Sequence, residues 1–399
     1  MSSNEMSRNL FSYQNNDLCF SGVRLTEMPE VKNYSEPFLI YKKSLIAERI
    51  QWVKSWKKLK QLHFAVKANY HPNILKIFLE NGCGLDVVSQ GEIRAGLDIG
   101  FKPTDFIFSG VGKTKAEIEF AVDMGIYQIN VESASELRRI SEICLRRNKK
   151  ISVGLRVNPL IETPTHPYIS TALKDSKFGI DLVDVPECLD IIKKNSLVEF
   201  KCLSFHIGSQ ILDPLVFKES VDKMKIYYLD LKKNFSTLSR FDLGGGLGID
   251  YKDHDLFKDK MRWESLKTEY NDSLVNLDAD ILCELGRFMV ARSAIFISQV
   301  QYIKNKKMLV LDLGMNNNMR PSLYQAHHHF YNLHKNDQQN HNYAVVGPIC
   351  ESSDVFHKSF TLHTVHENDL LVMADCGAYV RSMASQYNLK NMASEVFID

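Results

Sequence analysis

The sequence predicts an α/β fold: a (β/α)8 TIM-like barrel plus a C-terminal β-domain that also takes in the N-terminal strands. Two observations carry this prediction. Between residues 62 and 285, short apolar runs alternate regularly with amphipathic segments, which is typical of parallel strands joined by helices. After residue 290 the amphipathic segments stop and β-like runs continue. The 399 residues are enough for a barrel of about 250 residues and a smaller domain.

The chain begins with a polar stretch that looks flexible up to residue 17, and it reaches strand-like runs at 18–23 and 37–41. We therefore assign residues 1–42 to the β-domain. The segment 43–60 alternates apolar and basic positions at helical spacing. It is expected to form a helix and to open the barrel domain, residues 43–290.

Eight strands are expected in the barrel, and amphipathic segments follow the first seven. A doubly wound sheet is the alternative, but its GxGxxG fingerprint is missing and the glycine run 244–246 comes late. The expected strands are 62–67, 84–89, 105–110, 127–133, 151–158, 201–208, 240–244 and 280–285. The expected helices are 72–82, 90–100, 113–125, 134–149, 183–196, 212–235 and 258–277.

Residues 291–399 are expected to form the β-domain. The three adjacent histidines 327–329 lie between its β-like runs. They could bind a metal, but adjacent side chains do not share a face, so a solvated loop is the favoured interpretation. The β-like runs are 294–304, 308–313, 342–347, 358–364 and 369–374.

The composition excludes several classes of function. The 49 basic and 48 acidic residues nearly balance, so neither a nucleic-acid nor a membrane-surface partner is expected. No apolar run approaches the ~18 residues of a membrane span, and the polar N-terminus does not resemble a signal peptide. The 8 cysteines lack metal-ligand spacing, which predicts free thiols in a reducing cytoplasm and no metal site.

Barrel enzymes carry their active sites at the C-terminal ends of the strands, and the unusual residues of this chain fall there. Lys67 follows the apolar run 62–66. A lysine in this place is either a solvated strand end or an amine that attacks a carbonyl. The other unusual residues also fall at the C-terminal ends of strands, and this favours the interpretation of Lys67 as a reactive amine. Those ends carry Asp86, Ser89, Asn158, His206, Ser209, the glycines 244–246, Glu284 and Arg287.

These residues have both structural and chemical interpretations. The glycine run is either a tight turn or a backbone cradle for an anion, and Arg287 suits a phosphate or a carboxylate. Glu284 is either an ion-pair partner or a carboxylate that keeps a heterocyclic nitrogen protonated. His206 is either a core histidine or a ring that stacks on an aromatic cofactor. With the amine of Lys67, the chemical interpretations describe a site for pyridoxal 5'-phosphate.

Longer motifs extend along the chain: FAVKAN, LDVVSQGEI, FSGVGKT, THPYIS-x5-KFGI, FHIGSQ, LGGGLGIDY, MRPSLY, VGPICESSD and GAYxxSMASQYN. With them the chain resembles the diaminopimelate decarboxylases. These are members of the alanine-racemase-like pyridoxal-phosphate enzymes, which include ornithine and arginine decarboxylases. The resemblance runs from about Leu18 to the C-terminus and implies the same barrel and β-domain.

The resemblance implies a role for each matching residue. Lys67 would bind the cofactor covalently, His206 would stack on its ring, and Glu284 would keep its pyridine nitrogen protonated. The implied cofactor contacts are Lys67, Asp86, His206, Ser209, Gly245, Gly246, Glu284, Gly286, Arg287 and Tyr379. The implied substrate contacts are Arg287, Arg320, Tyr324, Glu351 and Tyr379.

Cys350 matches the thiol that protonates the carbanion after CO2 leaves, so the implied catalytic set is Lys67, His206 and Cys350. In the family the Cys-Glu segment comes from the partner subunit, which implies a head-to-tail homodimer with shared active sites. Without the resemblance, Cys350 would be read as a small buried hydrophobe and Arg320 as a surface turn residue.

Diaminopimelate carries a second amino-acid group, which needs a cation for its carboxylate and an anion for its ammonium. Arg287 or Arg320 and Glu351 would supply these charges. Diamine-forming relatives typically carry Cys-Asp where this chain has Cys350-Glu351. This difference and the THPYIS segment favour decarboxylation of meso-2,6-diaminopimelate to L-lysine over ornithine or arginine.

The chain departs from the family pattern in three places. Leu285 replaces the usual proline before Gly286, and the run 389–392 replaces a usual Arg-Pro-containing run. Most relatives are expected to continue for some tens of residues past Asp399. A similarly shortened C-terminus occurs in related decarboxylases of siderophore and natural-product pathways. The alternative substrate is therefore a related amino acid from such a pathway. A racemase would need a second base that is not evident, and an inactive homologue would usually lose Lys67.

Overall fold

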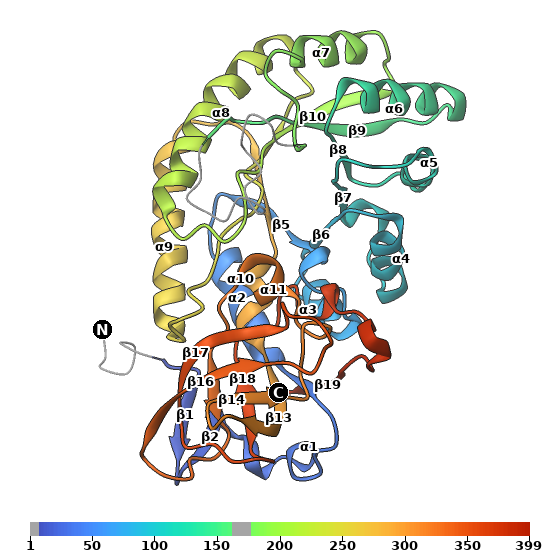
Figure 1. Cartoon of the computed structure of the whole chain (residues 1–399). Coiled ribbons are helices and arrows are strands. Elements are labelled where there is room, and N and C mark those ends of the chain that lie inside the picture. The colour runs from blue at the N-terminus through green and yellow to red at the C-terminus, as the bar shows by residue number, and fades with distance from the viewer. Residues whose placement is uncertain (1–7, 162–176) are drawn as a thin grey trace. The chain divides into compact units, whose positions relative to one another are not determined.

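The computed structural model describes residues 8–161 and 177–399 (Figure 1). Contacts divide the chain into two compact units, which we call the β unit and the barrel unit. The β unit comprises Met1–Ile46, Ile249–Met261 and Val290–Asp399, and the barrel unit comprises Ala47–Gly248 and Arg262–Met289.

Eight parallel strands of the described chain close into a barrel, which confirms the predicted fold class. The last strand, β12, pairs with the first, β5, and places Leu285 opposite Phe64. Each strand lies close to its expected range, because the alternation of apolar and amphipathic segments is strong here. The strands are β5 (Leu59–Ala65), β6 (Gly84–Val87), β7 (Phe106–Phe108), β8 (Gln128–Val131), β9 (Ile151–Arg156), β10 (Val198–Ser204), β11 (Arg240–Asp242) and β12 (Asp280–Leu285).

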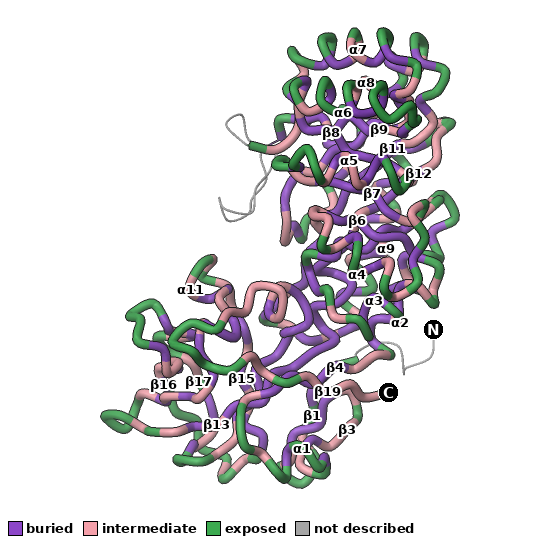
Figure 2. Tube along the Cα trace, turned by 90° about the vertical axis from the view of Figure 1, so that its right-hand side faces the viewer, coloured by how far each residue is buried: buried purple, intermediate pink, exposed green. Residues whose placement is uncertain are grey.

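The helices that alternate with these strands bury one face and expose the other, as the burial colours in Figure 2 show. Helix α6 is representative: it buries Leu137, Ile140 and Cys144 at helical spacing, and the Ser133 hydroxyl caps its first turn. The helices are α2 (Lys43–Lys54), α3 (Pro72–Glu80), α4 (Gln90–Ile99), α5 (Lys115–Met124), α6 (Ala134–Arg147), α7 (Val185–Lys193), α8 (Pro214–Asn234) and α9 (Leu256–Ser273).

A line of polar side chains lies inside the barrel. The Arg240 guanidinium donates to Gln128 Oε1 at 3.2 Å, and Gln128 Nε2 donates to Asn130 Oδ1 at 2.7 Å. Gly154 on the neighbouring strand leaves the space these side chains need, since a Cβ there would lie 2.5 Å from Asn130 Oδ1. Asn130 in turn donates to Glu284. The interior therefore holds Glu284 by hydrogen bonds rather than by apolar packing.

The described residues of the β unit form two sheets. A small antiparallel sheet has the order β1-β2-β3, and a larger mixed sheet has the order β15-β18-β13-β14-β16-β17, with β4 and β19 paired beside β13. Strand β4 comes from the N-terminal segment and pairs with β13, which confirms that the N-terminal strands join this fold. The strands are β1 (Phe11–Gln14), β2 (Asp17–Phe20), β3 (Val23–Arg24), β4 (Phe38–Lys42), β13 (Ala294–Lys304), β14 (Met308–Leu311), β15 (Phe330–Asn332), β16 (Asn340–Val346), β17 (Val355–His363), β18 (Leu370–Met373) and β19 (Ser394–Ile398). Its short helices are α1 (Pro29–Lys32) and α11 (Arg320–Tyr324), while α10 (Arg287–Val290) ends in this unit.

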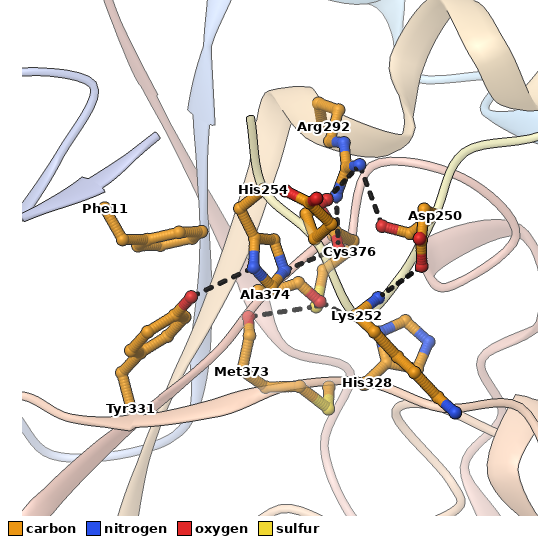
Figure 3. A network of polar contacts seen from close by, with 12 residues as sticks. Phe11, Asp250, Lys252, His254, Arg292, His328, Tyr331, Met373, Ala374 and Cys376 are labelled. Carbon is orange, nitrogen blue, oxygen red and sulfur yellow. Dashed lines mark hydrogen bonds and ion pairs between the residues drawn. The ribbon is translucent and has the colours of Figure 1, made fainter. Parts of the chain in front are cut away.

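The segment Ile249–Met261 belongs to the β unit, although the sequence places it inside the barrel domain. The buried guanidinium of Arg292 explains this difference (Figure 3). It donates to Asp259 Oδ2 and Asp375 Oδ2, both at 2.9 Å, and to the carbonyl oxygens of Asp250 and Asp253 at 2.9 and 2.6 Å. One arginine thus joins three distant parts of the chain.

The loop predicted at His327–His329 is present, but it is not solvated. His328 is 1% exposed, the ring of His327 packs 4.9 Å from that of His357, and the ring of His329 packs 5.0 Å from that of Phe360. These histidines lead directly into β15, whose pairing with β18 packs them against β17. Among the residues that the structure describes, no group of histidine, cysteine and acidic side chains has the arrangement of a metal site.

The described helices include none with the length and hydropathy of a membrane span.

Candidate active site

Lys67 lies just past the end of β5, in the single turn Val66–Ala68. The last four residues of the strand are buried, and then the lysine side chain is 42% exposed. Its Nζ forms an ion pair at 3.0 Å with Oδ2 of Asp86, a carboxylate on β6 that is 1% exposed. The buried acid therefore holds the amine at the C-terminal end of the barrel strands, where a ligand carbonyl can reach it.

Glu284 lies near the end of β12, among other polar groups. Its Oε1 accepts a hydrogen bond from Asn130 Nδ2 at 3.0 Å, and its carboxyl also contacts that of Asp242. Burial, and then the neighbouring Asp242 and Asp86, raises the pKa of Glu284 well above its usual range. Burial likewise raises the pKa of Asp242 to about 6. A cation beside this pair would favour the ionised form, so Glu284 suits a ring nitrogen that carries a proton.

The His206 ring is fixed by the glycine run. Its Nδ1 accepts the Gly245 N–H at 3.1 Å, so the proton of the neutral ring is on Nε2. Burial, and then the cations Arg156 and Lys67, lowers the pKa of His206 well below its usual range. His206 is therefore a neutral, oriented imidazole, as a ring that stacks on an aromatic cofactor should be.

The glycine run packs closely against neighbouring strand ends. A Cβ on Gly245 would lie 2.0 Å from the Glu284 carbonyl oxygen, and one on Gly246 would lie 2.4 Å from that of Gly208. Gly246 also has a φ of +109°, which disfavours any side chain. Packing alone therefore requires these glycines, and phosphate binding by Gly245 and Gly246 stays a prediction.

Arg287 follows β12 after Gly286 and is 7% exposed. Its guanidinium donates to Ser209 Oγ at 3.2 Å, so two of the predicted phosphate ligands lie together. Leu285, which replaces the family's proline, is buried and extends the pairing of β12 with β5. Leu285 therefore leaves Glu284 and Arg287 at the C-terminal end of the barrel strands.

The barrel residues fit pyridoxal 5'-phosphate by their chemistry. Lys67 offers an amine, Glu284 a carboxyl that gains from a protonated ring nitrogen, His206 a neutral flat ring, and Arg287 with Ser209 donors for a phosphate. Sequence reasoning missed Asn130 and Asp242, which hold Glu284, and the ion pair at 2.6 Å between Arg156 and Glu132. Polar residues at alternate positions of β8 were the available signal for Asn130.

In the β unit, Arg320 begins α11 and is only 4% exposed, so the alternative of a surface turn residue is wrong. Tyr324 ends the same helix and is half-buried. Tyr379 has a φ of +61°, a conformation that costs a non-glycine residue energy and is common at functional sites. The preceding Gly377 permits this turn, because a Cβ there would lie 1.8 Å from the Val290 carbonyl oxygen.

Cys350 and Glu351 are exposed at a turn between β16 and β17. Asp354 fixes this turn: its Oδ2 accepts the Ile349 N–H at 2.8 Å and its Oδ1 accepts the Met315 N–H at 2.7 Å. All eight cysteines lie in described residues, and Cys350 is the exposed one. The alternative of a buried hydrophobe is therefore wrong for Cys350.

Other strand-end residues have local roles. Ser89 caps α4, since its Oγ accepts the Glu92 N–H at 3.2 Å, and Asn158 Oδ1 accepts the Leu160 N–H at 3.0 Å. The THPYIS segment, residues 165–170, lies outside the described residues.

Comparisons with known proteins agree with this chemistry. Residues 42–291 match the family model described as "Pyridoxal-dependent decarboxylase, pyridoxal binding domain". A diaminopimelate decarboxylase of Aquifex aeolicus is 34% identical over 390 residues, covering 97% of this chain and 92% of that protein. Another, of Bacteroides thetaiotaomicron, is 40% identical over 335 residues, covering 83% and 86%. The crystal structure of diaminopimelate decarboxylase from Helicobacter pylori complexed with L-lysine superposes with a TM-score of 0.86 at 36% identity, covering 92% of this chain and 93% of that one.

Proposed function

Since the chain belongs to the diaminopimelate decarboxylase family of pyridoxal-dependent enzymes, we propose that it removes CO2 from meso-2,6-diaminopimelate and releases L-lysine. The observation that carries this proposal is the extent of the similarity, which covers 97% of the chain and so includes the barrel-end residues and the β unit. The chemical class is that of a pyridoxal-phosphate-dependent amino-acid decarboxylase.

The barrel residues would hold the cofactor and set its charge. Bound pyridoxal phosphate supplies an electron sink for the pair of electrons left when CO2 departs. Glu284 would keep the proton on the ring nitrogen, supported by Asn130. His206 would fix the plane of the ring, and Lys67 would provide the covalent attachment. Phosphate recognition is assigned to Ser209, Gly245, Gly246, Gly286, Arg287 and Tyr379.

The residues of the β unit would act on the substrate. Cys350 would deliver a proton to the carbon that has lost CO2, which suits a thiol exposed on a rigid turn. Glu351 would pair with the remote ammonium of diaminopimelate, and Arg320 with its remote carboxylate. Arg287, Tyr324 and Tyr379 complete the proposed substrate contacts.

We further propose a head-to-tail homodimer in which Cys350 and Glu351 reach the partner's barrel. The exposure of this fixed turn supports the arrangement, because a catalytic thiol and a substrate-binding carboxylate have little function facing solvent. A cytoplasmic location is proposed from the free thiols, since none of the eight cysteines forms a disulfide in the described structure.

The decisive experiment offers the cofactor-loaded protein a panel of amino acids and measures released CO2 and the product. meso-Diaminopimelate should have the highest kcat/KM, ahead of L-lysine and L-ornithine by about 100-fold or more, because a simple diamino acid leaves the remote cation without its carboxylate. A preference for either diamino acid would contradict the remote-carboxylate assignment. A preference for a carboxylated siderophore-type amino acid would keep the chemistry and change the pathway. Arg320→Ala and Glu351→Ala should reduce diaminopimelate turnover while leaving the bound cofactor's absorbance unchanged.

A further inference from the structure

A polar cavity of about 290 Å³ lies in the β unit, and none of the described residues that line it is among those proposed to bind cofactor or substrate. Its volume is close to the lower end of the ~300–1,000 Å³ that is typical of small-molecule sites, so a ligand of the size of a free amino acid fits. The lining comes from three parts of the chain: the loop 35–37 before β4, the sheet residues Gln301 and Asp312 with the asparagines 316–317, and the run 390–393. The last of these includes most of the run in which the chain departs from the family pattern.

Asn316 gives the reason to expect a ligand in this cavity. It is 2% exposed, and no group among the residues that the structure describes donates a hydrogen bond to its Oδ1. A buried amide oxygen without a donor is rare, because it has lost its hydrogen bonds to water without replacing them. The neighbouring Asn317 also lines the cavity and is 5% exposed. A ligand with an N–H group would therefore supply the donor that Asn316 needs.

The charged groups of the lining are two carboxylates and one ammonium, those of Asp312, Glu36 and Lys390. Asp312 is fixed, because its Oδ2 accepts from the Tyr34 hydroxyl at 2.6 Å and its Oδ1 accepts from the Gln299 N–H at 2.9 Å. Burial raises the pKa of Asp312, while the hydrogen bond from Tyr34 and the charge of Lys390 oppose this rise. A ligand with both an ammonium and a carboxylate matches both signs, whereas a phosphate would face two carboxylates and a metal ion would face Lys390.

Two of the chain segments that line the cavity also hold the turn that carries Cys350. The Cys350 N–H donates to Asn388 Oδ1 at 2.8 Å, and Asn388 lies two residues before the lining run 390–393. Asp354, which fixes the same turn, accepts the Met315 N–H, and Met315 directly precedes the two lining asparagines. A ligand that moves or stiffens either segment therefore affects the position of the turn.

We propose that this cavity binds a free amino acid, or another small zwitterion with an ammonium and a carboxylate, and that the bound ligand adjusts the Cys350 turn and so regulates turnover. The ammonium donates to Asn316 Oδ1 and is attracted by Asp312 and Glu36, while the carboxylate is attracted by Lys390. The regulatory part rests on the proposed role of Cys350 as proton donor, whereas the binding site does not.

The first experiment measures binding. The cofactor-loaded protein is reduced with borohydride, so that the probes cannot react with the cofactor, and its Tm is followed while glycine, L-alanine, L-lysine, acetate or methylammonium is added. At least one amino acid should raise the Tm, as a ligand of the folded state does. Its Kd should be lower than those of acetate and methylammonium by about 10-fold or more, because each of these offers only one of the two charged groups.

Two variants place the ligand in this cavity. Asn316→Leu should have a Tm no lower than the wild type without ligand, since replacing an unsatisfied polar group by an apolar one of similar size is neutral or stabilising, but it should bind the amino acid about 10-fold or more weakly. Lys390→Glu should weaken amino-acid binding about 3- to 10-fold and favour ethylenediamine, which carries two ammonium groups. The matched control Lys358→Glu changes an exposed lysine of the same unit outside the lining, and it should resemble the wild type.

The second experiment measures kcat of the unreduced, cofactor-loaded protein at saturating meso-diaminopimelate, with and without the amino acid that binds most tightly. Competition in the active site raises KM alone. Binding in the cavity should change kcat by about fivefold or more, the lower end of typical allosteric coupling, and adding the amino acid should leave the kcat of Asn316→Leu unchanged.

The possible failures are distinct. If no amino acid raises the Tm, or if both variants keep the wild-type affinity, the cavity is not the site. Equal affinity for acetate or methylammonium would contradict the ligand class. Binding that both variants weaken, with an unchanged kcat in the wild type, would overturn the regulatory part alone. The same binding in a protein that does not decarboxylate meso-diaminopimelate would contradict the proposed function and support the site. If Asn316→Leu does not fold, Lys390→Glu decides the assignment.

Discussion

Replacing Arg292 by methionine should destabilise the β unit strongly and in a pH-dependent way. The guanidinium and its partners Asp259 and Asp375 are each 1% exposed. Removing the cation therefore leaves two buried carboxylates without their shared guanidinium, and also removes hydrogen bonds to two carbonyl oxygens. Breaking a buried ion pair by removing one partner costs about 3–5 kcal/mol. For a unit of this size about 2–4 °C of Tm is lost per kcal/mol, so the transition should fall by roughly 6–20 °C.

The pH dependence has a definite sign. Burial opposes ionisation of Asp375, but Arg292 and then His254 outweigh it and hold the pKa of Asp375 below its usual value. In the wild type the ionised carboxylate therefore contributes stability at every pH above the unfolded-state pKa of about 4, and this is lost only below that pH. In Arg292→Met, Asp375 stays buried but loses its main neighbouring cation, so the pKa of Asp375 in the folded state rises above its value in the unfolded state. The difference in Tm between the two proteins should be largest at pH 7 and above, and it should narrow toward pH 5.

Differential scanning calorimetry or thermally induced loss of protease resistance, from pH 5 to 8, measures the effect. Arg24→Met is the matched control, because Arg24 belongs to the same unit and pairs at 3.1 Å with the exposed Glu27, an interaction worth about 1 kcal/mol or less. A shift for Arg292→Met no larger than that of the control, or one that does not vary with pH, would refute the reasoning.

Three further predictions concern the active site. Borohydride should fix the cofactor to the peptide that contains Lys67. Lys67→Ala should lose both the adduct and the turnover, whereas the control Lys60→Ala, which changes an exposed lysine on the same strand, should lose neither. An adduct on another lysine would show that the assignment of Lys67 is wrong. Glu284→Gln should still bind the cofactor but lower kcat by about 100- to 1000-fold, because the charge facing the ring nitrogen is lost; near-normal kcat would exclude this role. When Lys67→Ala and Cys350→Ala chains are mixed, up to about a quarter of the sites should recover activity, because each mixed dimer has one site with both native residues. If activity does not recover although subunit exchange is demonstrated, each site is built within one chain.

The barrel was predictable because its signal is local. Each strand is an apolar run and each helix an amphipathic segment, so the chain near Lys67, Glu284 or His206 already shows where a strand ends. The short strands β1, β15 and β19 were missed because pairing with distant residues creates them. Ser394 in β19, for example, lies opposite Phe38 in β4. The local sequence around either residue does not indicate that the two strands pair.

The residues proposed as catalytic were chosen from the barrel rule and the family motifs, but the side chains that contact Glu284 could not be chosen in this way. Asn130 and Asp242 look like ordinary strand residues, and only the closed barrel places them beside Glu284. The burial of His328, which is 1% exposed, is still further from the sequence, where it was one of three adjacent histidines.

The position of β4 in its sheet has a consequence for how the protein is made. Its residues 38–41 are almost completely buried, with Tyr41 opposite Ala294 of β13 and Phe38 opposite Ser394 of β19. A ribosome must therefore add about 250 residues, at about 5–20 per second, before this apolar strand meets its first neighbour. For some 10–50 s the nascent chain carries a strand with both edges unpaired, a hazard for aggregation. The yield of this protein should accordingly depend more on chaperone supply and on the rate of translation than on the stability of the finished barrel.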